Sequence, residues 1–264
     1  MKTKTLLAAI PLLLAPLLVS STASAVAAPP RTLHFTSNEH GAYATTQALG
    51  FRGHDTTMST WAVNRIPAGS KALVWVGLPK TRASAQVSPA FKAFVAANHA
   101  NPKLYGFYLT DEPLDGTDAP AIRAYSDYIH AHAPGKKAFI TVLDKPGRYF
   151  AYRPAVTHLD LMGLDPYPVA RGVLRTNKIP QAFAHARASG IPGSKILPFF
   201  QTFGDSYYTA PTAAQLRYRI AQWAARVPHP QMDYAYSWSK QGTSLKAALA
   251  TRADWRRIMA AHNR

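Results

Sequence analysis

The feature that most constrains the fold of this chain is a repeated alternation of short apolar runs and longer helical stretches. Runs rich in β-branched and aromatic residues predict eight strands, at 32–36, 49–53, 72–78, 104–109, 138–143, 159–164, 196–203 and 232–238. Segments with helical periodicity lie between or after many of them, at 88–97, 119–135, 179–190, 212–227 and 244–262. This alternation predicts an α/β fold of the (β/α)₈ TIM-barrel type.

An open, doubly wound sheet is the alternative fold. Such a sheet usually carries a glycine-rich phosphate turn after its first strand, and "SNEHGAY" does not match that pattern. The predicted strands are also continuous apolar runs, as expected for strands covered on both faces. Two connections fit the barrel less well, because the first is short and the fifth (144–158) has a poor helical pattern. We expect one barrel domain over residues 32–264.

The first 25 residues have the layout of a secretory signal peptide. Lys2 and Lys4 precede an apolar run that ends in Ala23-Ser24-Ala25, a small-residue cleavage pattern. We therefore expect a signal peptide at 1–25, a short linker at 26–31, and a secreted, extracellular protein with no membrane span after cleavage.

The amino-acid composition limits which metals and macromolecules the chain is expected to bind. The chain has no cysteine, which excludes disulfides and thiolate metal sites. The formal net charge is +17, but no nucleic-acid motif or dense Lys/Arg block accompanies it. We expect a monomer without cofactor or metal whose partner is a carbohydrate polymer, with an anionic polymer favoured by the charge.

Acidic residues gather where the barrel would be functional. Of only 13 Asp and Glu, nine follow or end predicted strands, and catalytic groups in this fold lie at the C-terminal ends of strands. The predicted catalytic residues are Glu112 and Asp111. Tyr and Trp side chains beside carboxylates suit a sugar, and the predicted substrate-binding residues are Asp165, Tyr167, Trp238, Gln201, Asp144, Asp55 and Glu39.

The pair Asp111-Glu112 ends the apolar segment "YGFYLTDEPL". Adjacent carboxylates raise each other's proton affinity, which helps to keep one of them protonated as a proton donor. Neighbouring side chains within a strand point to opposite faces, but this constraint relaxes at the strand end. We expect Pro113 to hold Glu112 in an extended conformation.

An apolar fourth strand that ends in Asp-Glu resembles the substrate-assisted retaining hexosaminidases, and "YLTDEP" is similar to the Asp-Glu-Pro segment of bacterial barrel glycosidases. The resemblance implies that Glu112 is the general acid/base and that Asp111 orients a 2-acetamido group of the substrate, which acts as the nucleophile. It makes Tyr167 a candidate for the acetamido contact and Trp238 a candidate for the pocket floor. The chain departs from the classical hexosaminidases by having Leu109-Thr110 in place of a glycine-rich lead-in.

Other functions stay open. No glutamate ends the seventh strand, so a retaining pair of glutamates is not expected, but an inverting scheme could use Asp165 or Asp144 as its base. A non-catalytic, secreted carbohydrate-binding barrel is the main alternative. A metal-dependent hydrolase is a third, and its candidate ligands are His34, His40, His54, Asp55 and Glu39.

Overall fold

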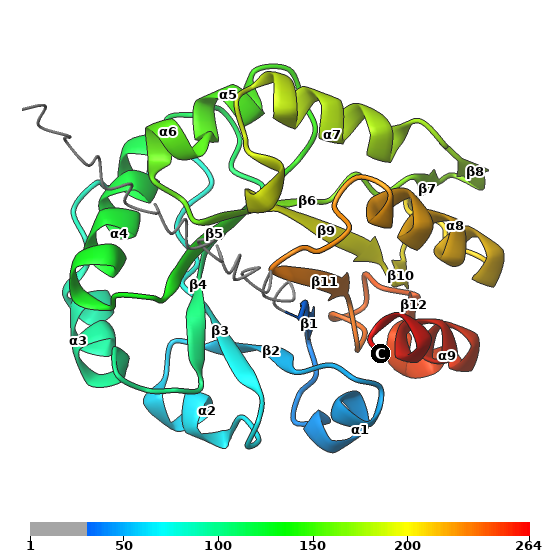
Figure 1. Cartoon of the computed structure of the whole chain (residues 1–264), viewed down its shortest axis with the longest axis horizontal. Helices are drawn as coiled ribbons and strands as arrows, with labels where there is room; N and C mark the ends of the chain where they lie inside the picture. The colour runs from blue at the N-terminus through cyan, green and yellow to red at the C-terminus, as the bar shows by residue number, and fades with distance from the viewer. Residues whose placement is uncertain (1–30) are drawn as a thin grey trace, which may run out of the picture.

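The computed structural model describes residues 31–264, so the predicted signal peptide and almost all of the linker lie outside the described residues. Eight parallel strands close into a barrel that helices surround (Figure 1). Around the barrel the strands follow the order β1-β11-β9-β6-β5-β4-β3-β2. The closed ring confirms the predicted (β/α)₈ TIM barrel and excludes the open doubly wound sheet.

The barrel strands are β1 (Leu33–Thr36), β2 (Gly53–Thr57), β3 (Lys71–Trp75), β4 (Leu104–Asp111), β5 (Lys137–Val142), β6 (Leu161–Leu164), β9 (Ile196–Gln201) and β11 (Met232–Tyr236). Two antiparallel pairs extend the loops, β7 (Val169–Ala170) with β8 (Val173–Leu174) and β10 (Phe203–Gly204) with β12 (Ala247–Ala248). The helices are α1 (Tyr43–Ala48), α2 (Thr60–Arg65), α3 (Pro89–Asn98), α4 (Ala119–His132), α5 (Arg148–Tyr152), α6 (Pro154–Thr157), α7 (Lys178–Ala188), α8 (Ala213–Ala224) and α9 (Ala253–His262), with 3₁₀ turns η1 (Gly193–Lys195) and η2 (Leu249–Thr251).

Two helices show how local sequence sets element boundaries. The Ser88 side chain accepts a hydrogen bond from the Phe91 N–H, and Pro89 occupies the first turn of α3. Thr212 and Gln215 form a reciprocal capping box at the start of α8. Both caps satisfy backbone N–H groups that a helix N-terminus leaves without partners.

The core has two layers, because alternate residues of each strand face opposite sides. One layer fills the barrel with aromatic side chains, and the Phe199 and Tyr234 rings stack in it with centroids 4.6 Å apart. The other layer lies between the strands and the helices and contains the larger hydrophobic cluster, including Trp223 and Trp255. Within residues 31–264, no helix has the length and hydrophobicity needed to cross a bilayer.

The second strand differs from its prediction. It was expected at 49–53 but runs from Gly53 to Thr57, so Asp55 lies within the strand and not after it. Gly53 pairs with Phe35, whose ring would clash with a Cβ at position 53. A contact with the first strand therefore determines where β2 begins. Helix α2, which follows, was not predicted.

The last predicted helix, at 244–262, is also shorter than expected. Ala247 and Ala248 pair with Gly204 and Phe203 in an antiparallel ladder, and α9 begins only at Ala253. The fifth connection forms two short helices, α5 and α6, as its poor helical pattern indicated.

Candidate active site

A cavity of about 660 Å³ opens at the C-terminal ends of the barrel strands. Six acidic side chains line it: Glu39, Asp55, Asp111, Glu112, Asp165 and Asp205. Its aromatic lining consists of Tyr43, Trp75, Tyr108, Tyr167, Phe199, Phe203, Tyr208, Tyr234 and Tyr236. The cavity therefore combines carboxyl groups with aromatic walls at the mouth where this fold places catalytic residues.

Glu112 enters the cavity because the backbone turns sharply after β4. Its φ is +47°, and its N–H donates to the Thr141 carbonyl at 3.0 Å. The prediction that Pro113 keeps Glu112 extended is therefore wrong. A left-handed φ is costly for a residue with a side chain, and here it ends strand alternation so that Asp111 and Glu112 both line the same cavity.

Two side chains hold Asp111. The Tyr108 hydroxyl donates to one Asp111 oxygen at 2.7 Å, and Lys80 Nζ lies 3.4 Å from the other. Tyr108 is buried and also bonds to the Thr141 hydroxyl. Burial, together with the charge of Asp111, raises the pKa of Tyr108 well above its usual value, so the phenol keeps its proton. Asp111 therefore has a neutral donor below it and a cation at the rim.

Glu112 and Asp165 form a carboxyl pair. Asp165 is buried, and its pKa is raised well above the usual range by burial and by the charge of the neighbouring Glu112. Two neighbouring carboxylates repel each other when both are ionised, so the pair holds one proton. An inverting scheme with Asp165 as its base requires roughly 6.5–9.5 Å between the two carboxyl groups, and it stays an alternative at this site.

A second acidic group lies at the ends of β1 and β2. His54 Nδ1 is 2.5 Å from a Glu39 oxygen, and both side chains are almost fully buried. Burial raises the pKa of Glu39 to about 9 and lowers the pKa of His54 to about 4. The two groups are therefore neutral at pH 7, and the protonated Glu39 carboxyl donates a hydrogen bond to His54 Nδ1.

Asp55 belongs to the same group. Burial, followed by the charge of Glu39, raises the pKa of Asp55 to about 7, although the Asn38 N–H donates to it at 3.0 Å. The cavity therefore contains several carboxyl groups that hold protons near neutral pH. Protonated carboxyl groups can donate hydrogen bonds as well as accept them.

Besides the predicted catalytic residues Asp111 and Glu112, four predicted substrate-binding residues line the cavity: Asp165, Tyr167, Asp55 and Glu39. The side chains that sequence reasoning missed include Tyr108, Tyr234 and Tyr236. The sequence carried no signal for Tyr108, because residues three positions apart on a regular strand face opposite sides; a register shift between Tyr108 and Asp111 brings the two side chains together. Tyr236, whose hydroxyl bonds to Gln241, could have been found as the end of the eighth barrel strand.

Three predicted substrate-binding residues do not line the cavity. Asp144 accepts a hydrogen bond from His185 at 2.9 Å, and Gln201 is buried with its amide bonded to Val169 and Thr209. Trp238 packs in the layer between strands and helices, because β11 ends at Tyr236. The expected pocket floor at Trp238 is corrected: Phe199 and Tyr234, which belong to the barrel interior, line the cavity instead.

The ligand set of the metal-dependent alternative does not converge. His40, Asp55 and Glu39 line the cavity, but His34 is bonded to Asp233 on the outer side of the barrel. The five side chains named for that alternative therefore do not surround one point in the described part of the chain.

No known protein-family profile matches the chain. No curated protein matches its sequence. The structure resembles the GH18 chitinase ChiB of Flavobacterium johnsoniae with a TM-score of 0.55 and 7% identity, over 88% of this chain and 93% of that one. It resembles GH5_18 from Streptomyces cattleya, solved in complex with GlcNAc, with a TM-score of 0.58 and 12% identity over 88% and 79%. The spore cortex-lytic enzyme SleL of Bacillus cereus gives a TM-score of 0.55 and 9% identity over 89% and 75%. At these identities the likeness establishes the fold, which is the TIM barrel of these glycoside hydrolases.

Proposed function

We propose that this protein is a secreted glycoside hydrolase that acts on a polysaccharide or cell-envelope glycan, with Glu112 as general acid/base and Asp111 assisting. One observation carries the proposal: the two carboxyl groups enter the same aromatic-walled cavity at the C-terminal mouth of the barrel. Glycosidic cleavage requires a positioned proton donor and a group that stabilises positive charge at the anomeric carbon, and this cavity offers both.

The proton comes from the Glu112–Asp165 pair. Because Asp165 is buried and the charge of Glu112 further raises its pKa, the pair retains a proton near neutral pH. Glu112 donates it to the glycosidic oxygen while the bond from that oxygen to the anomeric carbon breaks. General acid catalysis of this kind contributes roughly 10²–10⁴-fold to a rate.

The nucleophile is proposed to be the substrate's own 2-acetamido oxygen. It forms a bond to the anomeric carbon, and the Asp111 carboxylate accepts the acetamido N–H and balances the developing positive charge. Water then attacks the same carbon, the bond from that carbon to the acetamido oxygen breaks and restores the acetamido group, and the water gives a proton back to Glu112. This scheme needs only one carboxylate beside Glu112, and Asp111 lines the same cavity, whereas Asp144 does not.

Aromatic side chains supply the sugar contacts. Trp75 is 41% exposed and lines the cavity, and its ring meets Tyr108 edge-on with centroids 4.9 Å apart. Tyr167, whose ring lies 4.9 Å from that of Phe203, forms part of the same lining. Aromatic faces of this kind bind the C–H faces of a pyranose.

Secretion, a monomeric state and an anionic polymer substrate belong to this proposal. Secretion rests on the N-terminal sequence, and the anionic polymer rests on the net charge, which is +17 for the full sequence and +15 without Lys2 and Lys4. A basic surface would attract an anionic envelope glycan and raise its local concentration at the mouth.

The test is release of reducing ends from chitin-type, peptidoglycan-type and acidic polysaccharides. Wild type is compared with Glu112→Gln and with Asp127→Asn, a carboxylate-to-amide control at an exposed site. We expect Glu112→Gln to lose at least about 100-fold in rate and Asp127→Asn to retain activity. If no glycan is cleaved and both wild type and Glu112→Gln bind one, the chain is the carbohydrate-binding barrel of the alternative function.

A further inference from the structure

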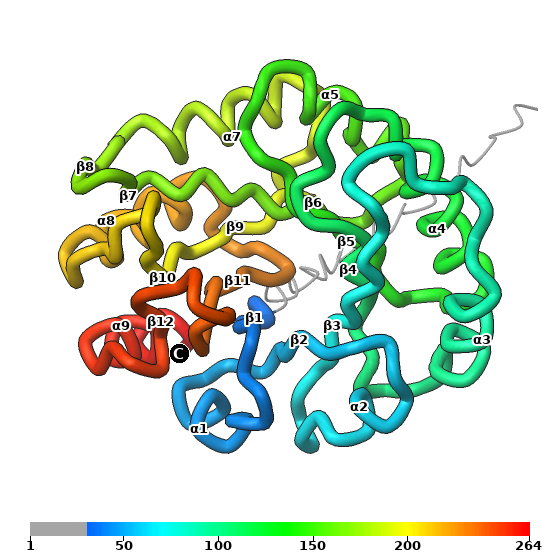
Figure 2. The backbone as a smooth tube through the Cα atoms, turned by 180° about the vertical axis from the view of Figure 1, so that it is seen from behind, coloured from blue at the N-terminus to red at the C-terminus, as the bar shows by residue number. Residues whose placement is uncertain are grey.

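A second cavity, of about 650 Å³, lies on the outer side of the barrel. It is lined by residues from the outer face of β1, β9 and β11 and from α8 and α9. The two helices lie side by side in both views (Figure 1, Figure 2). His34 and Asp233 are the second residues of β1 and β11, so this cavity is near the N-terminal ends of the strands, away from the acidic mouth.

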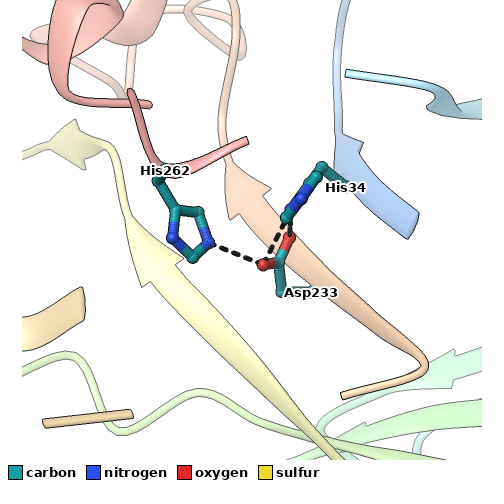
Figure 3. Close-up of side chains that lie close together, drawn as sticks. All are labelled: His34, Asp233 and His262. Carbon is teal, nitrogen blue, oxygen red and sulfur yellow. Dashed lines mark hydrogen bonds and ion pairs between the residues drawn. The ribbon is translucent and has the colours of Figure 1, made fainter. Parts of the chain in front are cut away.

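Three potential ligands meet there. His34 Nδ1 lies 2.9 and 3.0 Å from the two oxygens of Asp233, and His262 Nε2 lies 2.8 Å from one of them. One nitrogen or oxygen from each side chain lies within 4.8 Å of the others. Figure 3 shows the imidazoles of His34 on β1 and His262 in the last turn of α9, both turned toward the Asp233 carboxylate on β11.

The surroundings make this arrangement unusual. The neighbouring residues of the two strands, Phe35 and Tyr234, face the barrel interior, whereas His34 and Asp233 face the layer of helices. That layer is otherwise the main apolar core, and Asp233 is 1% exposed in it. A buried carboxylate needs a partner such as a hydrogen-bonded imidazole or a metal ion, and two imidazoles beside one carboxylate can provide this by binding one cation together.

We propose that His34, Asp233 and His262 bind one divalent transition-metal ion of the zinc type. Two imidazoles and one carboxylate are the usual protein ligands of zinc sites that keep a fourth position open. Ligands about 2.0–2.1 Å from a tetrahedral ion are about 3.3 Å from one another. The carboxylate-to-imidazole distances of 2.8–3.0 Å need to lengthen by only a few tenths of an ångström.

The three ligand atoms, which lie within 4.8 Å of one another, can approach further if the His262 side chain moves. His262 is the last residue of α9, and its side chain is 22% exposed. The cavity that contains the three ligands is also lined by Arg31 and Arg264. Water or a small anion would complete the coordination there, and these basic groups favour the anion.

The ion would join three elements that are far apart in the chain. His34 and His262 belong to the first strand and the last helix, and Asp233 is the register partner of His34 on β11. A metal bound only by the folded state stabilises that state by mass action. The role is therefore structural, and it does not depend on the glycosidase reaction at the opposite mouth.

The test is zinc titration of chelator-treated, tag-free protein by calorimetry, with visible absorption of the Co²⁺ form as a second readout of tetrahedral coordination. We expect one ion per chain. At zinc concentrations about 100-fold above the dissociation constant, the unfolding temperature should rise by about 5–10 °C.

His262→Ala should abolish this binding, and circular dichroism would verify its fold, since the residue is at the end of the last helix. His229→Ala is the matched control, because His229 lines the same cavity but is not among the three ligands. Asp233→Asn removes the anionic ligand and should likewise abolish zinc binding. The proposal is overturned if wild type binds no zinc, or if folded His262→Ala binds it as tightly as wild type, which would leave the cluster as a hydrogen-bonded brace.

Discussion

Replacing Glu39 by glutamine should stabilise the protein at neutral pH, although the substitution falls inside the candidate active site. Glu39 is 3% exposed, and burial raises its pKa from 4.5 to about 9. The unfolded chain releases this proton above pH 4.5, whereas the folded chain keeps it. Folding therefore becomes less favourable as the pH rises between these two values.

The size of the stability change follows from the pH interval over which only the unfolded chain has released the Glu39 proton. One proton taken up on folding changes the free energy of unfolding by about 1.4 kcal/mol per pH unit. At pH 7, which is 2.5 units above 4.5, Glu39 costs on the order of 3 kcal/mol. A glutamine at this position carries no such cost, and its amide can still donate to His54. We expect a gain of this order, with an unfolding temperature higher by several degrees.

The assay is urea unfolding at half-unit steps from pH 5 to pH 8, for wild type, Glu39→Gln and Asp115→Asn. Asp115 is an exposed loop residue whose pKa is lowered by its hydrogen bonds to Thr117, so its amide variant should keep the wild-type slope over this range. Asp55, with a pKa raised to about 7, adds a slope of the same sign up to pH 7 in all three proteins.

A charged pair would give the opposite result. If Glu39 were ionised against a protonated His54, removing one partner would leave a buried charge and cost roughly 3–5 kcal/mol. A less stable Glu39→Gln variant with an unchanged pH slope would therefore refute the neutral assignment. NMR of the His54 ring at pH 7 would report the same difference directly.

Other buried groups lead to two more predictions. Asp165→Asn removes the shared carboxyl proton but keeps a donor toward Glu112. The fold should therefore persist, while the pH–rate profile of glycan cleavage changes shape. An unaltered profile would contradict proton sharing. Arg219→Met should leave stability unchanged or raise it by about 1–4 kcal/mol in urea unfolding. The Arg219 guanidinium is fully buried, and burial lowers its pKa to about 9. It donates to Gln201 at 3.3 Å, but two of its nitrogens have no partner among the described residues.

The architecture was predictable because it depends on local patterns. Apolar runs followed by helical segments are visible in the sequence, and the observed barrel strands overlap or adjoin the predicted runs. The shift of β2 was not predictable in this way. Its start depends on the Phe35 ring covering Gly53, a contact between two strands, and the run at 49–53 contains Phe51, which belongs to the core before the strand begins.

The site was predictable as a region but not as an arrangement. Because strand ends share one mouth, Asp111, Glu112 and Asp165 were expected near one another. Their actual contacts depend on backbone geometry that sequence patterns do not encode. The φ of +47° at Glu112 reverses the extended conformation inferred from Pro113 and turns that carboxyl toward Asp165, across β5, which lies between β4 and β6.

The missed Tyr234 depends on strand alternation, whereas the errors at Gln201 and Trp238 have other causes: the Gln201 amide is bonded to backbone groups of Val169 and Thr209, and β11 ends before Trp238. Each strand has one face toward the barrel and one toward the helices, and a shift of one residue exchanges them. On β11, Tyr234 faces inward and lines the cavity, while Asp233 faces the helices. Without the register of the barrel, a polar or aromatic residue near a strand end cannot be assigned to either face.

The same alternation explains why an acidic site can hold protons in so basic a chain. The carboxyl groups lie on an interior packed with Phe and Tyr rings, and burial is the largest cause of the raised pKa values of Glu39, Asp55 and Asp165. Lys80 contributes its positive charge at the rim, where it contacts Asp111. If the proposed function holds, the interior would recognise a neutral sugar ring through hydrogen bonds, whereas the positive charge outside would attract the polymer that carries it. Substitutions in the interior should then alter cleavage with little effect of salt, and substitutions of exposed lysines and arginines should alter its salt dependence.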